Sequence, residues 1–137
     1  MTEPRVPHAG AMRLLDRVLE HDADAIACAA TSHRDPANPL LRDGILPAIC
    51  GVEYALQAMA AHGALTGSGE AQPPGYLASL RGVEMAVERL DDIAADLRVE
   101  ARALSRAARG FVYAFTVAAG GRILLSGQAA IIIPEAP

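Results

Sequence analysis

One stretch of the chain, Leu46 to Leu65, most constrains the fold, because it is the longest helix-like apolar stretch in the sequence. Nearly every side chain in it is small or apolar, so a helix here must be buried on most of its circumference. Pro47 fits the first turn of such a helix, where its missing N–H is not needed. A helix that is apolar on most sides needs other elements that wrap around it.

Glu53 is the one charged side chain inside this stretch. Burial removes water from an ionised acid and favours its protonated form, unless a cation or a hydrogen-bond donor pairs with it. A carboxyl group in that state is a good proton donor near neutral pH. Glu53 is therefore a candidate catalytic acid. The alternative is a structural acid bonded to loop amides or to an arginine.

Strand-like segments fill most of the remaining chain. Met12–Glu20 and Ala25–Ser32 flank an Asp-rich break and predict a hairpin, although the first of them could pass for a short helix. A proline-marked loop then leads to the helix, and Gly- and Pro-rich breaks at 66–69 and 72–75 follow it. Four further strands are expected, at Tyr76–Val87, Leu97–Leu104, Gly110–Ala118 and Arg122–Ile133. The order predicts one α+β domain over 1–137, an antiparallel sheet wrapped around one long apolar helix.

Composition excludes several classes of protein. A formal charge of -4 gives no global reason to expect nucleic acid as the partner. All 12 basic residues are arginine, which excludes Schiff-base chemistry and a P-loop lysine. Cys28 and Cys50 are isolated in apolar runs and are expected to be buried free thiols in a reducing compartment. No signal peptide or membrane span is apparent, so we expect a cytoplasmic protein without membrane contact.

Three stretches resemble the hotdog-fold 3-hydroxyacyl-carrier-protein dehydratases of the FabZ/FabA type. Pro7-His8 followed by Met12–Val18 is similar to their N-terminal signature, where the histidine is more often structural. Pro47, Glu53 and Gln57 match the Pro-Gly-x-x-x-x-Glu/Asp-x-x-x-Gln start of their central helix. Tyr76–Leu80 through Arg98–Glu100 resembles the strand pair that follows. Ser32–Pro39 with Asp43-Gly44 and Gly51–Ala55 looks closer still to the divergent dehydratase homologues of aryl-polyene pigment clusters, the ApeP-like group.

The resemblance implies a reaction. Water would be eliminated from a 3-hydroxyacyl thioester on an acyl carrier protein, giving a trans-2-enoyl thioester, with no cofactor or metal. A histidine would remove the α-proton, and Glu53 would protonate the departing hydroxyl. Amides at the helix start would polarise the thioester carbonyl. Pro47, Gly51 and Gln57 are therefore the candidate substrate-binding residues, although Gln57 could equally bond a strand backbone.

The histidine of that family is missing from its usual place. It stands fourteen residues before the helix acid, where this chain has Pro39, and the nearest upstream histidine is His33, twenty residues before Glu53. Either the loop carries six extra residues and His33 swings into the site as the catalytic base, or the base has been lost and His33 only caps its loop. In the second case the chain would be a pseudo-dehydratase that binds acyl carrier and partners an active homologue. A hotdog acyl-thioesterase is a further alternative.

The resemblance also implies an assembly. The family forms dimers through sheet edges, with base and acid from different protomers, so a homodimer or a heterodimer with a related dehydratase is expected. Arg102, Arg106 and Arg109 cluster in the sequence and could dock the acidic carrier protein. The alternative is a solvated strand edge kept soluble by charge.

Overall fold

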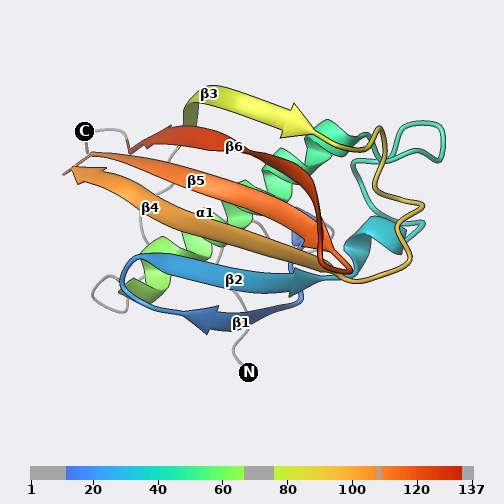
Figure 1. The fold of residues 1–137 in the computed structure, drawn as a ribbon, viewed down its shortest axis with the longest axis horizontal. Coiled ribbons are helices and arrows are strands. Elements are labelled where there is room, and N and C mark those ends of the chain that lie inside the picture. Colours follow the sequence, from blue (N-terminus) through green and yellow to red (C-terminus); the bar gives the residue numbers. More distant parts are fainter. Residues whose placement is uncertain (1–11, 67–75, 108, 134–137) are drawn as a thin grey trace.

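The computed structural model describes residues 12–66, 76–107 and 109–133. A six-stranded sheet curves around helix α1 (Gly51–Thr66), as Figure 1 shows. The strands are β1 (Arg17–His21), β2 (Ala25–Ala30), β3 (Tyr76–Met85), β4 (Leu97–Ala107), β5 (Gly110–Ala119) and β6 (Arg122–Ile132). Their order across the sheet is β1-β2-β4-β5-β6-β3, and every neighbouring pair is antiparallel. The sheet is therefore open, with β1 and β3 as its two edges.

The predicted order of elements is confirmed. The first two segments form the β1–β2 hairpin, and the four later strands appear with ends shifted by a few residues. Gly120 and Gly121, with φ of +57° and +78°, make the tight turn between β5 and β6, a conformation that glycine adopts without strain. α1 ends at Thr66, the first residue of the break predicted at 66–69. The rest of that break, the break predicted at 72–75 and His8 of the N-terminal signature lie outside the described residues. Across the described ranges, no helix combines the length and apolarity needed to cross a membrane.

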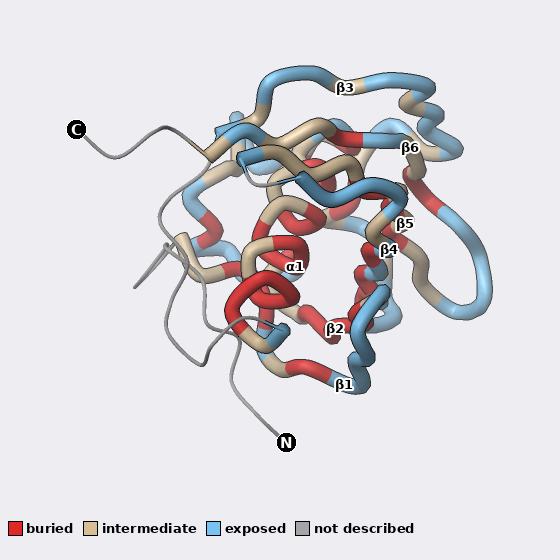
Figure 2. The backbone as a smooth tube through the Cα atoms, turned by 90° about the vertical axis from the view of Figure 1, so that its left-hand side faces the viewer, coloured by how far each residue is buried: buried red, intermediate tan, exposed pale blue. Residues whose placement is uncertain are grey.

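The core lies between α1 and the inward face of the sheet. Figure 2 shows the buried part of the chain concentrated on α1 and on the strands that surround it. β4 shows why: Leu97, Val99 and Ala101 are buried against α1, while the residues between them are exposed. This alternation with period two is what a strand covered on one face requires.

A short 3-10 turn, η3 (Ala48–Cys50), precedes α1 directly. Pro47 stands just before this turn, and α1 begins only at Gly51. The expectation that Pro47 lies in the first turn of the helix is therefore wrong. At Gly51 the helix comes close to the sheet, because a Cβ atom there would lie 2.6 Å from Cδ2 of Leu125 and 3.5 Å from Cγ2 of Val117. The absence of a side chain at Gly51 thus lets the start of α1 pack against β6 and β5.

Candidate active site

Glu53 lies in the first turn of α1 and is only partly buried. Leu56 and Ala60 follow at helical spacing and are also partly buried, whereas most other residues of α1 are buried. Ile49, in η3, extends this face and is 46 % exposed. We call Ile49, Glu53, Leu56 and Ala60 the outward stripe. The expectation that Glu53 is enclosed is therefore wrong for the single chain, because the open sheet leaves one side of α1 uncovered.

His33 is completely buried, in the short 3-10 turn η2 (Ser32–Arg34). Its Nε2 lies 3.0 Å from the carbonyl oxygen of Ile93 and 3.1 Å from that of Ala95. Two carbonyl acceptors require Nε2 to carry the hydrogen, so Nδ1 holds the lone pair of the neutral ring. Nδ1 has no hydrogen-bond partner among the described residues. Burial lowers the pKa of His33, which keeps the ring neutral at physiological pH.

The neighbouring Arg34 reinforces this attachment. Its guanidinium donates to the carbonyl of Ala94, and Nη2 lies 2.7 Å from Oδ1 of Asp96. The turn at 32–34 is therefore hydrogen-bonded to residues 93–96, which lead into β4. The His33 ring is closed to solvent and attaches its own turn to Ile93 and Ala95. This position is closer to the alternative that His33 only caps its loop than to the role of catalytic base.

Both polar atoms of Gln57 bond to backbone of the segment before β1. Oε1 accepts from the amide of Leu14 at 2.9 Å, and Nε2 donates to the carbonyl of Met12 at 2.5 Å. The side chain is fully buried. These bonds hold residues 12–14 on α1. The alternative to substrate binding was a bond to a strand backbone, and Gln57 does bond backbone, although residues 12–14 precede β1 and are not in a strand.

The two other candidates at the helix start are also occupied. The amide of Gly51 donates to the carbonyls of Ala48 and Ile49, so it is not directed at a ligand. The carbonyl of Pro47 accepts from the amide of Cys50 at 3.0 Å, and Pro47 forms an isolated bridge with Arg89. Pro47 and Gly51 thus shape the start of the helix that carries Glu53.

The remaining described histidines do not accompany Glu53. His62 is buried near the end of α1, with Nδ1 2.8 Å from the hydroxyl of Tyr113 and Nε2 2.9 Å from the carbonyl of Asp22. His21 is exposed at the end of β1, beside His62. The part of the chain that the structure describes contains no group of three or more histidine, cysteine or acidic side chains placed to hold a metal ion.

The two cysteines differ in their burial. Cys28 is buried, and burial raises the pKa of its thiol to about 12, whereas Cys50 is only partly buried, contrary to expectation.

Arg102 and Arg106 both lie in β4, but Arg106 bonds the β1–β2 turn through the carbonyl of Ala23. The predicted docking patch for a carrier protein remains a prediction.

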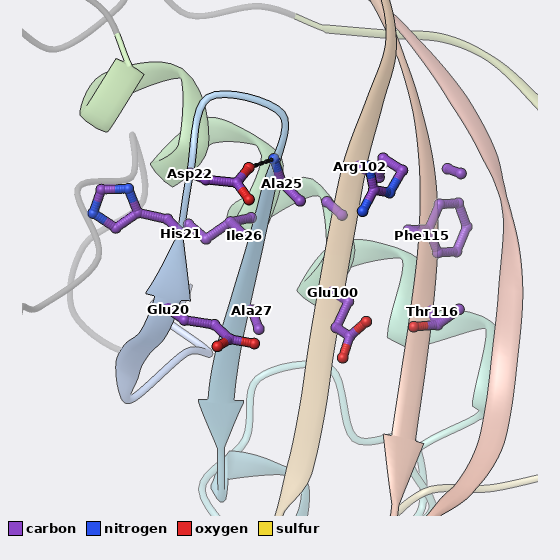
Figure 3. A pocket seen from close by; sticks show the side chains of 12 residues that line it. Glu20, His21, Asp22, Ala25, Ile26, Ala27, Glu100, Arg102, Phe115 and Thr116 are labelled. Atoms are coloured by element: carbon purple, nitrogen blue, oxygen red, sulfur yellow. Dashed lines mark hydrogen bonds between the residues drawn. The ribbon is translucent and has the colours of Figure 1, made fainter.

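A cavity of about 430 Å³ lies over β1, β2, β4 and β5 (Figure 3). Glu20, Glu100, Arg102 and Thr116 project into it from the face of the sheet that is turned away from α1. Neither Glu53 nor His33 lines it. The cavity is therefore separate from the chemistry that the sequence predicts, and the candidate acid lies instead on the outward stripe.

An open antiparallel sheet wrapped around one long apolar helix is the hotdog fold. Within this fold class the chain belongs to the ApeP-like dehydratase family, because residues 2–137 match the family described as ApeP dehydratase. A comparison with curated proteins gives no match.

Solved structures share the fold. The dehydratase heterocomplex ApeI:P from Xenorhabdus doucetiae matches with a TM-score of 0.82 and 24 % identity, over 95 % of this chain and 88 % of that chain. AziG from S. sahachiroi matches with a TM-score of 0.63 and 15 % identity, over 88 % and 91 %. A mutant of the thioesterase PA1618 from Pseudomonas aeruginosa matches with a TM-score of 0.62 and 13 % identity, over 85 % and 78 %.

Proposed function

We propose that this chain is the acid-bearing subunit of a two-subunit dehydratase, which removes water from a 3-hydroxyacyl thioester on an acyl carrier protein. Glu53 donates a proton to the departing hydroxyl. The base is a histidine of a partner subunit, a related hotdog dehydratase that retains the histidine this chain lacks at Pro39. The family match and the ApeI:P heterocomplex support this arrangement.

The observation that carries the proposal is the burial of His33. A general base must come within hydrogen-bond reach of the proton that it removes, directly or through one water. His33 has no exposed surface, and its Nε2 is engaged with two carbonyls. A second copy of this chain would bring an equally buried His33, so a homodimer supplies two acids but no accessible base from this position.

The outward stripe supports a partner at the same place. Ile49, Leu56 and Ala60 are apolar, and they surround the one carboxyl group on this face of α1. Ile49 is exposed, and Leu56 and Ala60 are partly buried. Apolar side chains that share one solvent-facing side of a helix are typical of a surface that another protein or a ligand covers. A partner covering this stripe would exclude water around Glu53.

The chemistry then divides between the subunits. The partner's histidine takes the α-proton, the electron pair forms the new carbon–carbon double bond, and the carbon–oxygen bond breaks. Glu53 gives its proton to the leaving oxygen, so that water departs and the thioester remains. The imidazolium of the partner then gives up its proton and the Glu53 carboxylate takes one up, which restores the starting state with no net oxidation or reduction.

The test is an assay of this chain with a FabZ-like subunit from the same source, using a 3-hydroxyacyl carrier protein. Mass spectrometry of the acyl chain follows loss of water, and a thiol reagent follows hydrolysis. We expect dehydration from the complex, none from this chain alone, and none from a complex with Glu53→Gln. Glu100→Gln is the matched control, because Glu100 is an exposed carboxylate on the opposite face of the sheet.

Three outcomes would contradict the proposal. Dehydration by this chain alone would show that it carries its own base. Full activity of the complex with Glu53→Gln would remove the acid assignment and leave a supporting pseudo-dehydratase. Release of free thiol with the hydroxyl retained would indicate a thioesterase.

A further inference from the structure

The connection between β3 and β4, residues 86–96, holds the start of the helix that carries Glu53. The amide of Ala48 donates to the carbonyl of Glu88 at 3.0 Å, and the amide of Leu90 donates to the carbonyl of Leu46 at 2.8 Å. Leu46 and Leu90 are both completely buried. Residues 46–48 and 88–90 are therefore paired like two short strands immediately before η3 and α1.

The side chain of Asp91 also bonds to this pair of segments, at the amide of Leu46. Its Oδ1 accepts from the amide of Leu46 at 2.8 Å. Arg89 holds the carboxylate from the other side, with Nε 3.1 Å from Oδ1 and Nη2 2.5 Å from Oδ2. A two-point guanidinium contact fixes both the position and the plane of a carboxylate. Arg89 lowers the pKa of Asp91 to about 2, so the group stays ionised throughout the physiological range.

We propose that Asp91, oriented by Arg89, is a positioning residue for Glu53. The inference rests on the proposed function, in which Glu53 is the acid. From the amide of Leu46 the chain runs through Pro47 and η3 into the first turn of α1, so a shift at Leu46 moves Glu53 with it. Displacements of about 1 Å at a reacting group can reduce rates up to about a hundredfold.

The same connection offers a matched comparison. Arg34 pairs with Asp96 at 2.7 Å, so this pair is also an arginine with an aspartate of the connection. Within the part of the chain that the structure describes, Asp96 is bonded to Arg34 and makes no hydrogen bond to residues 46–48, and its side chain is 54 % exposed. Asp96→Asn thus makes the same chemical change on the same connection without touching the helix start.

The experiment compares Asp91→Asn, Asp91→Ala and Asp96→Asn. Amide hydrogen exchange is measured on each purified chain, and kcat and KM on each assembled complex. We expect Asp91→Ala to speed exchange at Leu46 and in 51–54 about tenfold and to lower kcat about tenfold with KM little changed. Asp91→Asn, which keeps an acceptor for the Leu46 amide, should recover part of both losses. Asp96→Asn should alter neither quantity.

Two results would overturn the inference. One is unchanged exchange at the helix start in Asp91→Ala, or faster exchange there with unchanged kcat. The other is an equal effect of Asp96→Asn, or faster exchange spread equally over β4 and β5, which would indicate a general loss of stability. Failure of the proposed function is recognised separately, because Glu53→Gln would then match the wild-type complex. The exchange data would still decide whether Asp91 holds the helix start.

Discussion

The hydroxyl of Tyr54 donates to Oγ of Ser32 across 2.8 Å, and this bond joins α1 to the turn that contains His33. The direction follows from hydrogen count: Ser32 has one hydroxyl hydrogen, which it gives to the carbonyl of Leu14 at 2.8 Å. The Tyr54 oxygen also accepts from Nδ2 of Asn38 at 3.1 Å. Tyr54 is completely buried, so this network fixes the loop before the helix from inside the core.

Tyr54→Phe should lower the free energy of unfolding by about 1–2 kcal/mol, because it removes the acceptor of Asn38 and the donor to Ser32 while keeping the ring. Urea unfolding at neutral pH measures the change. Tyr76→Phe is the control, since Tyr76 is 54 % exposed on the edge strand β3. Equal stability of Tyr54→Phe and the wild type would mean that the network contributes nothing net.

His33→Gln should separate structure from catalysis. The amide of glutamine can still donate to the carbonyls of Ile93 and Ala95, and we expect a loss of about 1–2 kcal/mol in stability. The kcat of the assembled complex should stay within about threefold of wild type, since His33 does not contact substrate in our proposal. A folded His33→Gln complex as inactive as Glu53→Gln would instead identify His33 as the base.

Gly51→Ala should destabilise the chain despite its helical position. Overpacking against Leu125 costs about 1–3 kcal/mol, whereas the better helix propensity of alanine returns at most about 1 kcal/mol. In the background of Leu125→Ala the same change should cost less, because the clashing Cδ2 is gone. A double-mutant cycle measured by chemical unfolding tests this. An equal loss of unfolding free energy in both backgrounds would show that the new Cβ atom is accommodated by a shift other than one at Leu125.

Stability should fall as the pH falls below about 6.5, because burial lowers the pKa of His62 and of His33 below the ordinary value. The unfolded chain then binds protons that the folded chain does not. Asp22, His21 and Arg106 are the charged or titratable groups that act on His62, and protonation would oppose the hydrogen bond from Tyr113 to Nδ1. Urea unfolding between pH 8 and 5.5 measures the slope.

His62→Gln should make the unfolding free energy depend less steeply on pH. The dependence that remains should be the part due to His33. An identical slope in wild type and His62→Gln would show that His62 takes no part in the pH dependence.

The sequence predicted the architecture because the architecture follows from local patterns. Alternation in β4, the apolar helix and the paired glycines at Gly120 and Gly121 each restrict the backbone over a few residues. Their order then leaves few ways to bury α1. The exposure of Glu53 could not be predicted in this way, because small and apolar side chains occur all around α1. Which side stays uncovered depends on where the sheet ends.

The site residues were harder to assign for a related reason. His33 is hydrogen-bonded to Ile93 and Ala95, which lie 60 and 62 residues away in the sequence. Asp91 is hydrogen-bonded to Leu46, which lies 45 residues away. No local pattern marks such pairs, and both aspartate and histidine are common in loops for other reasons. Gln57 shows the opposite case. Its place in the helix motif was visible, but the same spacing suits a backbone bond and a substrate contact.

The outward stripe has a consequence for the amounts of protein in a cell. Side chains such as Ile49, Leu56 and Ala60 favour contact with other apolar surfaces over contact with water, so surplus copies of this chain would tend to self-associate or to be degraded. In the two-subunit enzyme that we propose, synthesis of the subunits in equal numbers would prevent such a surplus. The abundance of the scarcer subunit would then limit the number of working complexes.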